Sequence, residues 1–290
     1  MPRSIISSLG KRMAISIQQV SDYGTANPIV ARLSLQTSEL LQCCRMPQKQ
    51  KEELFGIMFS HVQPKVMACF SIKERLSKEI RAHQKKTDET GLELQAQGRA
   101  YMLPSILDLR LHAETFLYNA KSALRDFTAV FLVLFSKDFG KKAHYHKVHE
   151  WAEQHFGSAD PLTKMLDHDQ ATWIARIVKM RNAVEHPDDR SGVLHVENFT
   201  VTERGNTVFV TEPMWYLDSE TKGPIAAEMD VFVTNLLTFC EETVVLCLEK
   251  FISGFPIAFA EIPEAERDPA CPMRFRVVLS QMKTNAQPMH

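Results

Sequence analysis

Apolar side chains recur at every third or fourth position over most of the chain, which is the period of an amphipathic α-helix. The strongest stripe follows Pro104, and Gly140 is expected to close that helix. The pattern predicts helices over about 29–45, from Pro47 with an interruption at Pro64, over 104–138, over 144–155, from Pro161 into the segment 179–190, and over 224–252. We expect the two long apolar helices, 104–138 and 224–252, to form a bundle with the helix that carries Trp173.

The period changes to two between residues 193 and 218, where LHVENFTVTE, RGN and TVFVTEPMWYLD follow one another. This alternation predicts a β-hairpin with Gly205 in its turn. Two shorter segments near the end, PIAFAEIP and RFRVVL, predict two further strands. The expected fold is therefore mostly α, a helical bundle with a small antiparallel sheet. We expect an N-terminal helical extension over 1–100, the bundle over 101–254 and a C-terminal extension with short strands over 255–290.

Composition narrows the classes of function. The chain has 290 residues, 44% hydrophobic and 24% charged, with a formal net charge of −1. A protein that binds nucleic acid through bulk electrostatics is usually strongly basic, so any such contact must come from a local patch. The six cysteines contain no C-x-x-C pair, which predicts reduced core residues in a cytoplasmic protein. The longest uncharged apolar run, 127–136, is too short to span a bilayer, so no membrane is expected.

The segment KMRNAVEHPDDR, residues 179–190, carries the main candidate chemistry. On a straight helix Arg181 and His186 would lie roughly 140° apart. Pro187 biases His186 away from helical geometry, so the imidazole can turn back toward the guanidinium. A histidine can accept the proton of a 2′-hydroxyl or protonate a leaving oxygen, and an arginine can hold phosphoryl oxygens. Asn182 can donate to phosphate or orient Arg181, so this set suits RNA cleavage without a metal.

Arg181-Asn182-Ala183-Val184-Glu185-His186, at the end of a bundle helix, resembles the Arg-x4–6-His motif of HEPN domains. The upstream segment HAETFLYNAKSALRDF, 112–127, is similar to the long first helix of that family, and the resemblance covers roughly residues 100–252. It implies a homodimer with one composite site, and a metal-independent endoribonuclease of a toxin–antitoxin, defence or RNA-processing system. It also implies RNA as a ligand and an antitoxin or other protein as a partner. Glu114 or Asn119 would support the site. The inserted hairpin departs from the compact family pattern.

A simpler interpretation of the same residues stays open. Arg181 can form an ion pair with Glu185, four residues on, while His186 caps carbonyls at the helix end. The chain would then be a non-catalytic helical dimer or interaction module of the same fold.

Two other polar clusters offer alternatives. The face of the helix after Pro64 that carries Lys73, Lys78 and Arg81 can guide RNA phosphates, although such faces are more often plain solvated surface. His146 and His149 lie one helical turn apart and are the alternative metal ligands, although exposed histidines on an amphipathic helix explain them as well. No cofactor is expected, because the chain has no GxGxxG, P-loop or G-x-S-x-G motif.

Overall fold

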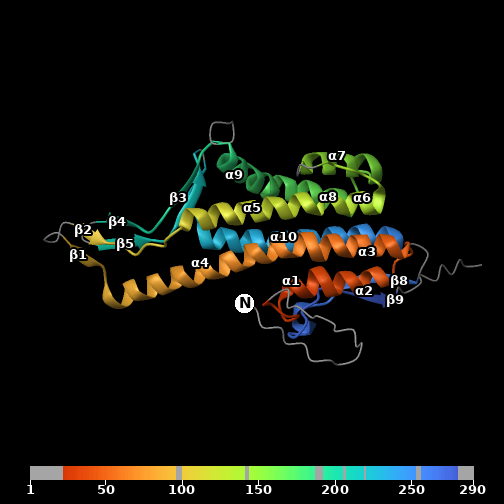
Figure 1. Cartoon of the computed structure of the whole chain (residues 1–290), viewed down its shortest axis with the longest axis horizontal. Helices are drawn as coiled ribbons and strands as arrows, with labels where there is room; N and C mark the ends of the chain where they lie inside the picture. The colour runs from red at the N-terminus through yellow and green to blue at the C-terminus, as the bar shows by residue number, and fades with distance from the viewer. Residues whose placement is uncertain are drawn as a thin grey trace, which may run out of the picture.

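The computed structural model describes residues 22–95, 100–140, 144–186, 192–204, 207–218, 220–252 and 256–279. The chain is mostly helical, with small antiparallel sheets at its periphery (Figure 1). The long helices run roughly parallel in stacked layers, and the strands between α9 and α10 lie at one end of the stack (Figure 1). The predicted fold class is confirmed at this level.

The N-terminal part forms two continuous helical rods, each containing a π-helical turn. The first rod consists of α1 (Pro28–Val30), η1 (Ala31–Gln36) and α2 (Thr37–Gln42). The second consists of α3 (Gln48–Gly56), η2 (Ile57–Val62) and α4 (Gln63–Thr90). The predicted interruption at Pro64 is wrong. Proline removes one backbone donor and crowds the preceding turn, and here the wider π-helical turn η2 directly precedes it, so the rod stays continuous.

The helix expected from Pro104 is shorter than its apolar stripe. α5 (Leu109–Phe127) begins after Asp108, which adopts a left-handed backbone conformation with φ 57°. Asn198 explains this late start, because its side chain bonds both the N–H and the carbonyl of Ile106 and holds that segment outside the helix. Thr128 separates α5 from α6 (Ala129–Phe135), which ends at the left-handed Ser136 rather than at Gly140.

The next helices follow the prediction. α7 (Tyr145–Phe156) matches the expected helix at 144–155. Asp160 then caps α8 (Pro161–Asp169) by accepting a hydrogen bond from the N–H of Leu162 at 2.9 Å. This helix continues through the π-helical turn η3 (Gln170–Ile174) into α9 (Ala175–Glu185), which carries the candidate motif.

The predicted hairpin is antiparallel but divides into two sheets. β3 (Leu194–Glu197) pairs with β6 (Met214–Leu217), which also pairs with β7 (Gly223–Pro224). β4 (Thr200–Arg204) pairs with β5 (Thr207–Thr211), while Gly205 lies outside the described residues. Asn198 lies between β3 and β4, where the two sheets separate, and its side chain bonds Ile106. A further antiparallel pair, β1 (Glu93–Gln95) and β2 (Ala100–Met102), precedes Ile106 in the chain.

The central helix is α10 (Ile225–Leu248), which the 3-10 turn η4 (Glu249–Phe251) extends. By length and composition Ile225–Phe251 could cross a membrane, but 67% of its most apolar stretch is buried inside the protein. It is therefore read as the core helix of the bundle. The predicted strands of the tail form the antiparallel pair β8 (Ile257–Glu261) and β9 (Phe275–Leu279), with the short 3-10 turn η5 (Glu264–Glu266) between them.

One hydrophobic core joins the N-terminal rods to the bundle. Leu76 and Ile80 of α4, Phe116 of α5 and Leu236 of α10 belong to the same buried cluster. α4 packs against both α5 and α10, so residues before 100 complete the core of the bundle. All six cysteines are free thiols, of which Cys44, Cys69, Cys240 and Cys247 are buried.

Candidate functional site

The candidate motif lies where the C-terminal end of α9 packs against α5 (Figure 1). Arg181 and Asn182 are in the last two turns of α9, and Glu185 is its final helical residue. His186 leaves helical geometry with φ −138° and ψ 69°, as expected for a residue before proline, while its N–H still bonds the carbonyl of Asn182 at 2.7 Å. Pro187 itself is outside the described residues.

Arg181 is held on two sides by its own chain. Its Nη2 lies 2.9 Å from Oε1 of Glu185, and its guanidinium lies 5.4 Å from the ring centre of Tyr118 on α5. Only 13% of the Arg181 side chain is exposed, and its Nε is buried without a hydrogen-bond partner among the described residues. The ion pair with Glu185 is the one that the simpler interpretation of the motif expects.

A lysine that sequence reasoning missed completes the arrangement. Nζ of Lys121 on α5 donates hydrogen bonds to Oδ1 of Asn182 and to Oε2 of Glu185, both at 2.8 Å. The sequence offers only a weak signal for Lys121, a basic residue one turn after Tyr118 on the polar side of α5. Basic residues occur at such positions on many solvated helix faces, so the signal does not indicate a site.

The electrostatics of the motif centre on one carboxylate. Partial burial acts to raise the pKa of Glu185. The hydrogen bond and charge of Lys121, together with the charge of Arg181, outweigh burial and hold that pKa below its usual range. The charge of His186 acts in the same direction. We call Tyr118, Lys121, Arg181, Asn182, Glu185 and His186 the α5–α9 cluster.

The supporting residues expected on α5 bond within their own helix. Glu114 forms an ion pair with Arg110 at 2.8 Å, and Asn119 donates to the carbonyl of Thr115 at 2.8 Å. Among the described residues, neither forms a hydrogen bond or ion pair with Arg181 or His186, whereas Lys121 and Tyr118 both contact the motif.

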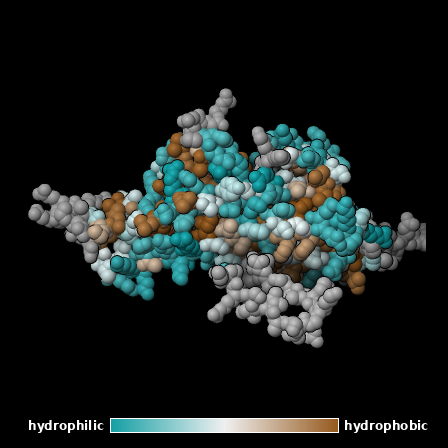
Figure 2. Space-filling view, in the orientation of Figure 1, coloured by the Kyte–Doolittle hydropathy of each residue, from teal (hydrophilic) through white to brown (hydrophobic). Residues whose placement is uncertain are grey.

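The basic face of α4 divides into two parts. Lys73 bonds Asp230 of α10 at 2.8 Å, and although burial acts to lower the pKa of Lys73, its bonds to Asp230 and Glu74 raise it. Lys73 therefore ties α4 to the core helix. Lys78 and Arg81 are exposed, and the surface over the outer part of α4 is predominantly hydrophilic (Figure 2).

The two candidate metal ligands of α7 have different polar and aromatic neighbours. His149 lies 3.9 Å from Asp167, and the ring of His146 packs 5.4 Å from that of His144. Among the described residues, no group of three or more His, Cys, Asp or Glu side chains could hold a metal ion.

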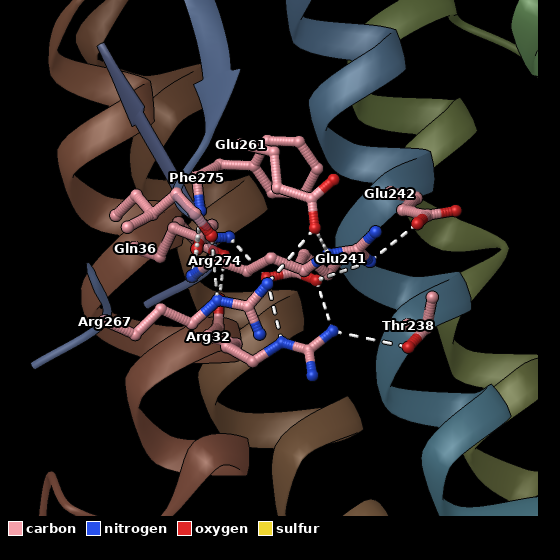
Figure 3. A network of polar contacts seen from close by, with 11 residues as sticks. Arg32, Gln36, Thr238, Glu241, Glu242, Glu261, Arg267, Arg274 and Phe275 are labelled. Atoms are coloured by element: carbon pink, nitrogen blue, oxygen red, sulfur yellow. Dashed lines mark hydrogen bonds and ion pairs between the residues drawn. The ribbon is translucent and has the colours of Figure 1, made fainter. Parts of the chain in front are cut away.

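A buried polar network is the largest feature that the sequence did not predict (Figure 3). Glu241 of α10 has a fully buried side chain that accepts bonds from Arg32 and from Gln36, the latter at 2.8 Å. Arg274 directly precedes β9. Its guanidinium lies 3.5 Å from the same carboxylate and 2.6 Å from that of Glu242. The network joins η1, α10 and the C-terminal strand pair, and its position between three elements marks it as structural.

The α5–α9 cluster thus places a guanidinium and an ammonium on one carboxylate at the protein surface. An amide is bonded to the ammonium, and an exposed imidazole follows the carboxylate in the chain. Such a set can bind an anion and transfer a proton without a metal. No family model, curated protein or solved structure matches this chain.

Proposed function

We propose that this chain is a HEPN-like, metal-independent endoribonuclease whose α5–α9 cluster binds and cleaves RNA. The observation that supports it is the gathering of Arg181, Asn182 and His186 at one end of α9, with His186 exposed and outside the helix. A cytoplasmic location and a toxin, defence or RNA-processing role belong to the same proposal.

The reaction would be an internal transfer at phosphorus. His186 accepts the proton of a 2′-hydroxyl, and the 2′-oxygen attacks phosphorus while the 5′-oxygen of the next nucleotide leaves. The leaving oxygen takes a proton, giving a 2′,3′-cyclic phosphate and a 5′-hydroxyl. Arg181 stabilises the additional negative charge on the phosphoryl oxygens. No electron transfer or external reagent is required.

Two copies would supply one histidine as base and one as acid. Exposed apolar side chains beside the cluster support such a dimer. Leu111 and Tyr118 are 58% and 51% exposed and lie seven residues apart, hence on the same face of α5. A monomer that exposes these side chains next to a polar cluster gains free energy by covering them.

The direct test is cleavage of mixed RNA in the presence of EDTA by the full chain and by His186→Ala. The matched control is His146→Ala, which removes an exposed histidine from α7. We expect the control to cleave like the unmodified chain and His186→Ala to lose at least about a hundredfold in rate. Equal cleavage by all three proteins, or cleavage by none, contradicts the enzymatic proposal.

The second candidate function is a non-catalytic dimer or interaction module. The ion pair between Arg181 and Glu185, together with the low exposure of Arg181, favours it. It predicts no RNA cleavage and a dimer that Tyr118→Glu converts to monomer, which light scattering after gel filtration measures. A chain that is monomeric before the substitution contradicts the dimeric form of this alternative.

A further inference from the structure

Two cations on different helices hold the carboxylate of Glu185, one at each oxygen. Arg181 of α9 lies 2.9 Å from Oε1, and Lys121 of α5 lies 2.8 Å from Oε2. A phosphodiester also shares one negative charge between two oxygens that can each accept a hydrogen bond. The carboxylate therefore occupies a position that suits a phosphodiester in charge and in number of acceptors.

Both cations keep their positions by contacts that do not involve Glu185. The guanidinium of Arg181 packs on the ring of Tyr118, and Lys121 also bonds Asn182. A site whose donors are fixed before the ligand arrives loses less entropy on binding than a flexible one. These two contacts remain available to the cations when the carboxylate leaves.

Glu185 is the most exposed of the three charged side chains, since Lys121 is 27% and Arg181 13% exposed. It is the last residue of α9, its side chain is 34% exposed, and the next residue has left helical geometry. Water can solvate the released carboxylate at this surface position. The backbone of α9 need not change for the carboxylate to turn outward.

We propose that Lys121 and Arg181 form a phosphodiester-binding site and that Glu185 fills it in the free chain as an internal competitor. The inference rests on the proposed function, because it names the group that holds the RNA backbone in that reaction. Lys121 is then a substrate-binding residue that the motif in α9 does not contain. RNA must displace Glu185 from both cations, so the free chain binds RNA more weakly than its cations alone would allow.

The test is binding of a fluorescein-labelled single-stranded 2′-O-methyl oligonucleotide to the full chain in EDTA, followed by fluorescence anisotropy. The blocked 2′-oxygen prevents cleavage, so binding is measured separately from the reaction. Glu185→Gln should lower Kd about three- to fivefold, the range of an exposed ion pair. The plot of log Kd against log salt should also steepen by about 0.7, because one further net positive charge contacts the single strand.

Glu114→Gln is the matched control. Glu114 forms an i,i+4 ion pair with Arg110 on α5, and its side chain is 31% exposed, close to the 34% of Glu185. The control should leave Kd unchanged. Lys121→Met should weaken binding about three- to fivefold. Glu185→Gln should increase affinity less in the Lys121→Met background than in the unmodified chain.

Unchanged or weaker binding by Glu185→Gln overturns the inference, as does an equal gain in Glu114→Gln, which would show a general effect of charge. Absence of oligonucleotide binding by every folded variant at low salt also overturns it. Circular dichroism establishes that each variant is folded. Tighter binding by Glu185→Gln without cleavage of unmodified RNA would retain the binding site and reject the endoribonuclease, so the two proposals fail separately.

Discussion

The carboxylate of Glu241 on α10 is bonded to the guanidinium of Arg32 on η1, 209 positions earlier in the chain. Glu241 has no exposed side-chain surface, and Gln36 and Arg274 also contact its oxygens. A buried carboxylate is stabilised only when its charge and lone pairs are matched. The first helical rod, the core helix and the C-terminal strand pair therefore depend on one another through this residue (Figure 3).

Replacement of Glu241 should destabilise the whole fold. Glu241→Gln keeps the size of the side chain but leaves Arg32, whose side chain is only 12% exposed, without its carboxylate partner. We expect the free energy of unfolding in urea to fall by about 3–5 kcal/mol. Glu242→Gln is the control, because Glu242 pairs only with Arg274 among the described residues and is 29% exposed, and it should cost about 1 kcal/mol or less. Equal losses in the two variants would contradict the central role of Glu241.

Gly223 should not tolerate a side chain. A Cβ at this position would lie 1.8 Å from Oε1 of Glu228, whose other oxygen accepts bonds from Trp215 and Arg176. Gly223→Ala would force Glu228 to move away from both partners and should lower the melting temperature, with a cost of about 1–3 kcal/mol.

Gly56→Ala is the matched control for that substitution. Gly56 has helical backbone angles, and nothing lies within 4 Å of its Cβ position. Alanine is the better helix former, so this variant should be as stable as the unmodified chain or up to about 1 kcal/mol more stable. A destabilised Gly56→Ala would show that general sensitivity to added methyl groups explains the result at Gly223.

The contribution of Glu185 to stability should depend on pH. The pKa of Glu185 is lowered in the folded chain, so its ion pairs stabilise the fold above the pKa that the residue has when unfolded. That stabilisation is lost as the pH falls through the folded pKa. The melting temperature of the unmodified chain should exceed that of Glu185→Gln at about pH 7, and the difference should disappear at a pH well below the ordinary glutamate pKa of 4.5. A difference that persists at the lower pH would exclude the ion pairs as its cause.

The exposed part of the α4 face should increase RNA affinity if the chain binds RNA. Lys78→Glu combined with Arg81→Glu reverses two positive charges on this face and thereby removes two contacts with phosphate. The slope of log Kd against log salt should become shallower by about 1.4 for a single strand. Lys49→Glu combined with Lys147→Glu reverses two exposed lysines of α3 and α7 and is the control. An equal change in both pairs would assign the effect to net charge alone.

Local sequence predicted the helices and strands where the signal was short-range. Pro161 predicted a helix start, and α8 begins at that residue with Asp160 as its cap. The apolar stripe after Pro104 overestimated its helix, because the side chain of Asn198, 92 positions later, bonds Ile106 and keeps that segment out of the helix. The predicted interruption of the helix at Pro64 is wrong, because the sequence carries no sign of the π-helical turn that keeps the rod continuous.

The sequence by itself determined the helical period, the paired strands and the presence of Arg181, Asn182 and His186 on one short segment, because these depend on neighbouring residues. Only the tertiary structure decided that Lys121 and Tyr118 of α5 contact that segment and that Arg32 and Arg274 enclose Glu241. A charged side chain looks the same in sequence whether it faces water or a partner on another helix. Its partner is chosen by how the buried apolar faces of the helices pack, and that choice is made over the whole chain at once.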